Sequence, residues 1–157
     1  LLKHLPKLKR GTREFPTQLP MHSAFHTPLL QATSDQARED LSDLAFQAPS
    51  VPLTDGHGFT YRPWCAAPSA LAHYTLGTQV SEVFDFTLGL RAALRHCAPD
   101  LLILLGPGNS LGAPCAQILL QERWRGMTSR ADLDAAQSSN EPAILSFGVA
   151  KQRERLV

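Results

Sequence analysis

Two short segments of the sequence hold the residue types that nucleophilic catalysis needs. His26 lies in "LPMHSAFHTPLL", after a short apolar run and directly before Thr27 and Pro28. Ser110 lies in "GNSLG", which matches the Gly-x-Ser-x-Gly pattern of a nucleophile elbow. A serine hydroxyl is a good nucleophile only when a base takes its proton, and the side chain that most often does so is histidine.

The order of residues argues against Ser110 as a nucleophile. Hydrolases with this elbow carry an acid and then a histidine after the serine. Here all six histidines precede Ser110. Pro107 and Gly108 favour a structural turn in which Ser110 caps the following helix. We interpret the segment as such a turn, and the nucleophile stays as the alternative.

His26 has a functional and a structural interpretation. A short strand is expected over residues 19–25, and Thr27 followed by Pro28 predicts the start of a helix. The positive end of a helix dipole disfavours further positive charge, so the neutral imidazole is favoured there. A neutral imidazole is what a general base needs at pH 7. The alternative is a partly buried histidine bonded to a neighbouring carbonyl.

The pattern along the chain predicts an α/β protein. Apolar residues recur at helical spacing over about 28–46, 69–79, 87–97 and 111–120. Short strands are expected at 51–53 and 143–147, and an irregular loop at 59–69. The run "LLILL" at 101–105 predicts a central parallel strand that is buried on both faces. A sheet around such a strand needs more strands than this chain offers. Since the first residue is Leu1, we expect a piece of a longer protein.

Composition argues against several functional classes. The chain has 157 residues, enough for one domain with a core, and its net charge of +1 gives no support to nucleic-acid binding. Its longest apolar run is too short to cross a bilayer, and no signal peptide is recognised. The three cysteines are widely spaced, which argues against a zinc site or a disulfide framework and favours the cytoplasm. No metal or cofactor is expected.

Four segments resemble, in order, the malonyl-CoA:acyl carrier protein transacylases and the acyltransferase domains of polyketide and fatty-acid synthases. "SAFHTPLL" resembles the family's catalytic-histidine motif. "PSVPLTDGHG" resembles its Pro-x-x-Pro-strand-turn segment, which usually has Asn where Asp55 stands. "QVSEVFDF" resembles a Gln-led segment that ends in an aromatic residue, and "PDLLILLGPGNSL" resembles a strand with its Gly-Pro-Gly turn. The matches cover about residues 19–120.

The resemblance implies the C-terminal part of an α/β-hydrolase-like acyltransferase with the end of an inserted ferredoxin-like subdomain. Residues 1–21 would close the small subdomain, residues 22–120 would belong to the large one, and residues 121–157 would be a C-terminal extension. The family's serine elbow and its carboxylate-binding arginine lie upstream of the histidine, and neither is in this chain.

The implied activity is malonyl transfer from malonyl-CoA to the phosphopantetheine thiol of acyl carrier protein, in fatty-acid or polyketide synthesis. His26 would be the catalytic base. Gln79 aligns with a glutamine close to the family's active site, where its amide would orient the ring or a nearby backbone group, unless it is a solvated helix-end residue. Phe25 stands where malonyl-selective domains tend to carry Phe, unless it only packs in the core. An acyl hydrolase of the same fold and a non-catalytic fragment remain as alternatives.

Overall fold

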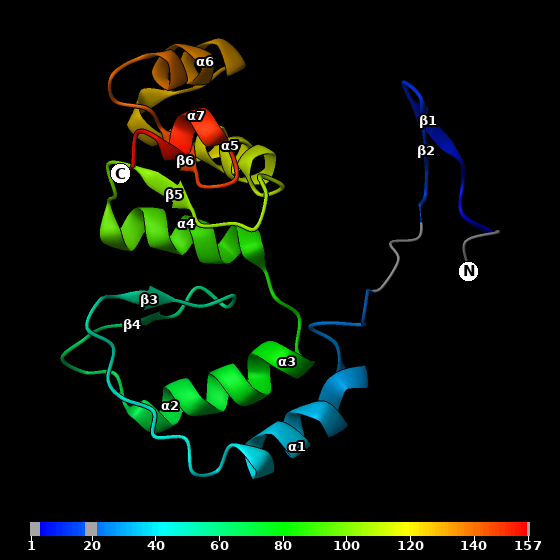
Figure 1. The fold of residues 1–157 in the computed structure, drawn as a ribbon, viewed down its shortest axis with the longest axis vertical. Helices are drawn as coiled ribbons and strands as arrows, with labels where there is room; N and C mark the ends of the chain where they lie inside the picture. Colours follow the sequence, from blue (N-terminus) through cyan, green and yellow to red (C-terminus); the bar gives the residue numbers. More distant parts are fainter. Residues whose placement is uncertain (1–3, 18–21, 157) are drawn as a thin grey trace.

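The computed structural model describes residues 4–17 and 22–156, and they form a mixed α/β structure (Figure 1). The first element is an antiparallel hairpin of β1 (Leu8–Arg10) and β2 (Arg13–Phe15), with Leu8 opposite Phe15. This hairpin stands apart from the rest of the chain in Figure 1, and its described side chains are exposed. It lies within residues 1–21, which the resemblance assigns to the small subdomain; residues 1–3 and 18–21 of that segment lie outside the described residues.

A pair of helices follows. A 3₁₀ turn, η2 (Pro28–Leu30), leads into α1 (Gln31–Asp40), and α2 (Pro68–His73), the π-helical turn η3 (Tyr74–Thr78) and α3 (Gln79–Ser81) form one continuous helix. The fully buried Ser34 donates a hydrogen bond from its hydroxyl to the Leu76 carbonyl at 2.7 Å, which ties α1 to the π-helical turn. The Arg38 guanidinium of α1 lies over Gly77, where a Cβ would overlap it.

A second hairpin, β3 (Leu53–Thr54) and β4 (Thr60–Tyr61), lies between α2 and α4 (Phe86–Cys97) (Figure 1). Its turn is fixed by Asp55, whose carboxylate accepts hydrogen bonds from the backbone N–H groups of His57 and Phe59, both at 2.9 Å. Gly89 lets α4 lie directly on this turn, because a Cβ there would come within 2.8 Å of the Asp55 carbonyl oxygen.

The C-terminal region is a small α/β unit. Strand β5 (Leu102–Leu104) pairs in parallel with β6 (Ile144–Ser146), and Ile103 lies opposite Leu145. Between the two strands come α5 (Gly112–Gln121), the turn η4 (Trp124–Gly126) and α6 (Arg130–Ser138), and α7 (Ala150–Arg153) follows β6. The buried core of the unit consists of Leu94, Cys115, Ile118, Leu119, Met127, Leu133, Ala143 and Ile144. Residues 121–157 therefore contribute a strand and a helix to the same core as α4 and α5.

Several local predictions were wrong. Residues 22–25 are not a strand, because the Thr27 hydroxyl donates to the Ala24 carbonyl at 2.7 Å and closes a turn; residues 19–21 lie outside the described part. The loop predicted at 59–69 contains β4. Helix α1 ends at Asp40 rather than near residue 46, and the apolar residues that extended the pattern, Leu41 and Leu44, are exposed.

The prediction for residues 101–105 was right in part. The segment does form a parallel strand, but it is not buried on both faces, since Ile103 is 46% exposed and Leu105 is 77% exposed. Within the described residues β5 has β6 as its neighbour on one edge and no strand on the other. No helix in the part of the chain that the structure describes is long and apolar enough to cross a membrane.

Candidate active site around His26

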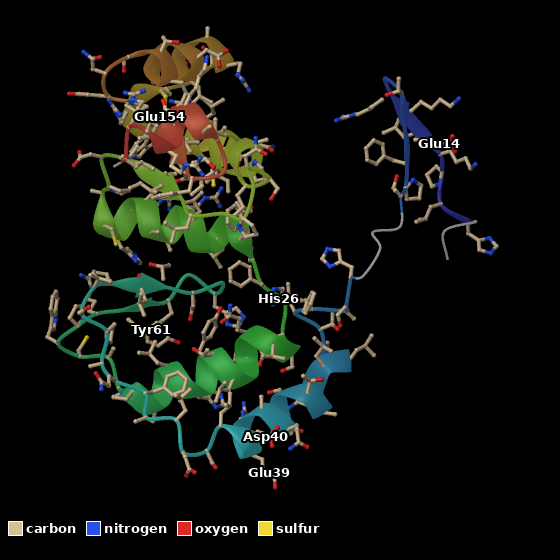
Figure 2. The ribbon with its side chains drawn as sticks, in the orientation of Figure 1. Glu14, His26, Glu39, Asp40, Tyr61 and Glu154 are labelled. Atoms are coloured by element: carbon tan, nitrogen blue, oxygen red, sulfur yellow. The ribbon has the colours of Figure 1, made fainter. Side chains whose placement is uncertain are left out.

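His26 lies beside the C-terminal end of α3, where the chain enters α1 (Figure 2). Its Nδ1 atom is 2.5 Å from the backbone carbonyl oxygen of Gln79. A carbonyl oxygen can only accept, so Nδ1 of the neutral ring carries the proton and donates it. The lone pair of the half-buried ring is then on Nε2, which leaves Nε2 as the atom that can take a proton.

The Gln79 carbonyl is available because α3 ends two residues later. The last carbonyls of a helix have no partner within the helix and must find one elsewhere. The Thr78 carbonyl accepts from the Glu82 N–H at 2.9 Å, and the Gln79 carbonyl accepts from His26. Carbonyls at a helix C-terminus carry partial negative charge. This end of α3 therefore stabilises the imidazolium that forms when His26 takes a proton.

The ring of Phe84 fixes the imidazole from a second side. The two ring centroids are 5.3 Å apart and the ring planes are inclined by 33°. Phe84 is itself held by the turn at Gly56: a side chain on Gly56 would overlap the phenyl ring, and the Asp85 N–H donates to the Gly56 carbonyl at 3.1 Å. The imidazole is thus positioned by a helix end and by a hairpin turn that are distant from it in the sequence.

The backbone of His26 is in the left-handed region, with φ of 58°. This conformation is uncommon for a residue with a side chain and is found most often where function or surrounding structure requires it. Here His26 lies inside the turn that the Thr27 hydroxyl closes on the Ala24 carbonyl, and its imidazole meets the Gln79 carbonyl. The helix start that the sequence predicted at Thr27 and Pro28 is present as η2.

The other predicted site residues lie around His26 in different ways. Phe25 is 56% exposed and contacts the His22 ring edge to face at 6.0 Å between centroids, so it does not pack in the core. Gln79 supplies its backbone carbonyl rather than its side-chain amide. Within the described residues, no hydrogen bond joins that amide to the imidazole.

The structure does not join Ser110 to a histidine. Ser110 is exposed and lines a cavity at the end of β5 with Leu104 and other residues of the segment 106–111, none of them a histidine. It does not cap the following helix, contrary to the prediction, because the N-cap residue of α5 is Leu111 and no side chain caps it. The segment is a structural turn that contains two glycines with positive φ, Gly106 and Gly108.

Asp55, which stands where the resembled family usually has Asn, is buried at the turn of the second hairpin. The side-chain oxygen that accepts the two backbone N–H bonds could belong to either residue type. Its second carboxylate oxygen accepts a hydrogen bond from the Tyr61 hydroxyl at 3.2 Å. Burial, together with the Asp55 carboxylate, raises the pKa of Tyr61 to about 12.

Phe84 and the two tyrosines near Asp55, Tyr61 and Tyr74, were not predicted as site residues from the sequence. Phe84 belongs to the "QVSEVFDF" segment, so an aromatic residue at a fixed distance from Gln79 was the signal that could have found it.

Comparison with known proteins gives no relative: no family model, no curated protein and no solved structure matches this chain. The function must therefore be argued from its own residues.

Proposed function

We propose that this chain is the histidine-bearing C-terminal part of an acyltransferase. The enzyme would be a cytoplasmic one that moves a malonyl group from malonyl-CoA to the phosphopantetheine thiol of acyl carrier protein. The observation that carries the proposal is the hydrogen bond between His26 Nδ1 and the Gln79 carbonyl, which leaves Nε2 free as a base. The four motifs that resemble malonyl transacylases supply the reaction class.

In the first half-reaction, His26 Nε2 takes the proton of a serine hydroxyl supplied by the part of the enzyme upstream of this chain. The serine oxygen attacks the malonyl thioester, a malonyl-serine ester forms, and coenzyme A leaves as its thiol with the proton from His26. The Gln79 carbonyl stabilises the imidazolium between these steps.

In the second half-reaction, Nε2 takes the proton of the carrier thiol. The thiolate attacks the malonyl-serine ester, and the serine oxygen recovers the proton as it leaves. The tautomer is the same in both halves, because the Gln79 carbonyl holds the proton on Nδ1 throughout. The same base therefore activates the serine hydroxyl first and the carrier thiol second.

The exposed surface of the α/β unit supports the view that more of the enzyme packs against it. Parallel strands in α/β proteins are normally covered on both faces. Ile103 and Leu105 are exposed, and β5 has a neighbouring strand on one edge only within the described residues. An upstream half of the large subdomain would cover these apolar side chains and bring the serine to His26.

Phe25 supports the malonyl preference. Its ring is exposed and directly precedes the catalytic histidine in the chain, so it offers a bulky apolar surface beside the acyl group. A ring next to the acyl α-carbon would leave little room for the methyl branch of a methylmalonyl group.

The test uses the longest reading frame that contains this chain, expressed as one protein. Radiolabelled malonyl transfer from malonyl-CoA to holo acyl carrier protein should fall by several orders of magnitude in His26→Ala, because an unactivated serine is a poor nucleophile. His4→Ala is the matched control, since His4 is exposed and lies before the first hairpin. Near-normal formation of malonyl-serine in a folded His26→Ala protein would contradict the proposal.

Two further outcomes separate the alternatives. Free malonate formed without malonyl carrier protein would assign the site to hydrolysis. The chain of 157 residues alone should transfer nothing, because it lacks the elbow serine. Transfer by the chain alone that disappears in Ser110→Ala would instead make Ser110 the nucleophile.

A further inference from the structure

A cavity lies between the hairpin β3–β4 and the helix formed by α2 and η3. Its volume is about 520 Å³. Figure 2 shows Tyr61 on the hairpin side of this space, above α2. The lining combines the Asp55 carboxylate with several rings and with small residues of α2 and η3: Asp55, His57, Phe59, Tyr61, Ser69, Ala70, His73, Tyr74 and Thr78. His26 is not among them, so this cavity is separate from the proposed active site.

The carboxylate of Asp55 places negative charge in the wall of the cavity. Asp55 is only 8% exposed and accepts hydrogen bonds from two backbone N–H groups and from the Tyr61 hydroxyl. These neutral donors stabilise the charge but do not cancel it. Within the described residues, no lysine or arginine forms an ion pair with Asp55. A cationic ligand would supply the missing opposite charge.

Aromatic rings line the same cavity as this carboxylate, and their planes are inclined to one another. Phe59 and Tyr61 have centroids 4.8 Å apart with planes inclined by 73°. Tyr61 and Tyr74 are 6.2 Å apart and inclined by 49°, and His57 and Tyr74 are 6.2 Å apart and inclined by 78°. Steeply inclined aromatic rings can direct more than one negative π face at a single cation, which is how aromatic cages bind quaternary ammonium groups. The Tyr74 hydroxyl is held in place because it accepts from the Gly56 N–H at 2.8 Å.

We propose that the cavity lined by Asp55, Phe59, Tyr61 and Tyr74 binds a methylated ammonium group, such as that of choline or of a methylated lysine. A small metal ion would need several oxygen ligands, and the cavity offers one carboxylate among rings. The oxygens of that carboxylate already accept three hydrogen bonds, which disfavours an ammonium rich in N–H donors. A methylated ammonium needs no hydrogen bonds and gains from charge and π faces together.

The first test compares the affinity of the whole chain for a cation and for its neutral isostere. Choline and 3,3-dimethylbutan-1-ol have nearly the same shape, and only choline is charged. Ligand-observed NMR at pH 8, where ordinary histidines are neutral, should give saturable choline binding. The alcohol should bind at least about tenfold more weakly, since it gains neither the Asp55 charge nor the cation–π attraction. Equal affinity for the two ligands, or no saturable choline binding, would overturn the proposal.

The second test substitutes single residues of the cavity lining. Phe59→Leu should weaken choline binding by about three- to thirtyfold with little effect on folding, because Phe59 is 60% exposed. Phe15→Leu, in the first hairpin and 39% exposed, is the matched control and should bind choline as the unmodified chain does. Asp55→Asn keeps an oxygen for the two backbone N–H groups while it removes the charge, and should weaken binding at least tenfold. If Asp55→Asn does not fold, Phe59→Leu alone tests the proposal, and unchanged choline binding in that variant would refute it.

Discussion

Replacement of His26 by alanine and by glycine separates the chemistry of its ring from the conformation of its backbone. Both substitutions remove the imidazole and its hydrogen bond to the Gln79 carbonyl. They differ at the backbone, because His26 has φ of 58° and only glycine adopts that region without steric cost. In the acyltransferase proposed above, both variants should lose malonyl transfer equally, whereas their stabilities should differ.

The expected difference in stability is small but measurable. A residue with a side chain in the left-handed region costs about 1–2 kcal/mol, which glycine avoids. Glycine also has more freedom in the unfolded chain, and this costs about 0.4–1 kcal/mol relative to alanine. At the middle of these ranges, the free energy of unfolding of His26→Gly should therefore exceed that of His26→Ala by about 0.8 kcal/mol. For a chain of this size that is a rise of roughly 1–4 °C in Tm. His26→Ala should fall below the unmodified protein by about 0.5–1.5 kcal/mol for the lost hydrogen bond. His26→Gly should fall by less, because relief of the left-handed backbone offsets part of that loss.

Thermal unfolding followed by circular dichroism measures these differences, and two alanines provide controls. Ala98 has φ of 42° at the end of α4, so Ala98→Gly should stabilise the chain in the same way. Ala70 lies inside α2, so Ala70→Gly should destabilise it by about 1 kcal/mol. If Ala98→Gly and Ala70→Gly behave as expected while His26→Gly melts below His26→Ala, the left-handed backbone at His26 and the reasoning built on it are refuted.

Three further predictions concern single side chains. Phe25→Ser in the complete enzyme should raise methylmalonyl use relative to malonyl by at most about two hundredfold, since one methyl group is worth about 1–3 kcal/mol in a pocket; an unchanged ratio of kcat/KM values would leave the ring without a role in selectivity. Gln79→Ala should reduce malonyl transfer by less than about tenfold, because the carbonyl that holds His26 belongs to the backbone; a loss as large as that of His26→Ala would assign the amide an essential role. The pKa of Tyr61 is raised from 10.0 to about 12, so the folded state keeps a proton that the unfolded state releases. The contribution of Tyr61 to stability should be complete below pH 10 and should be lost between pH 10 and 12, by at most about 3 kcal/mol. Urea unfolding at each pH should show a smaller fall in Tyr61→Phe, and an equal fall would place the titration elsewhere.

Local patterns were enough to find most of the helices and the parallel pair of strands. The apolar residues of α4 and α5 recur on one face, and both helices bury that face in the core around Leu94, Ile118 and Leu119. The strands β5 and β6 were expected from short apolar runs, and the structure pairs them in parallel across α5 and α6. Periodicity predicts such elements because each of them forms by burying one apolar face in the core, and that face leaves a repeating pattern in the sequence.

The features that the sequence did not predict depend on contacts between distant segments. Strand β4 is only two residues long, and it forms by pairing with β3, where Leu53 lies opposite Tyr61. The resembled motif placed Gln79 near His26 through its side-chain amide, but the group that binds the imidazole is the Gln79 backbone carbonyl. Because every residue has such a carbonyl, no pattern of side chains could indicate that this group would be used. It became available because the helix ends at Ser81, and the position of a helix end is among the least certain features of any sequence-based prediction.

The turn at Asp55 and Gly56 is the common support of the two candidate sites. On one side, the absence of a side chain at Gly56 admits the Phe84 ring, which lies against His26. On the other side, the Gly56 N–H fixes the Tyr74 hydroxyl, and the Asp55 carboxylate fixes Tyr61. A turn that is itself held by two hydrogen bonds to Asp55 and packed under α4 is a rigid element. Contacts with this turn therefore help to position both the imidazole and the aromatic rings, which is what a preorganised site requires.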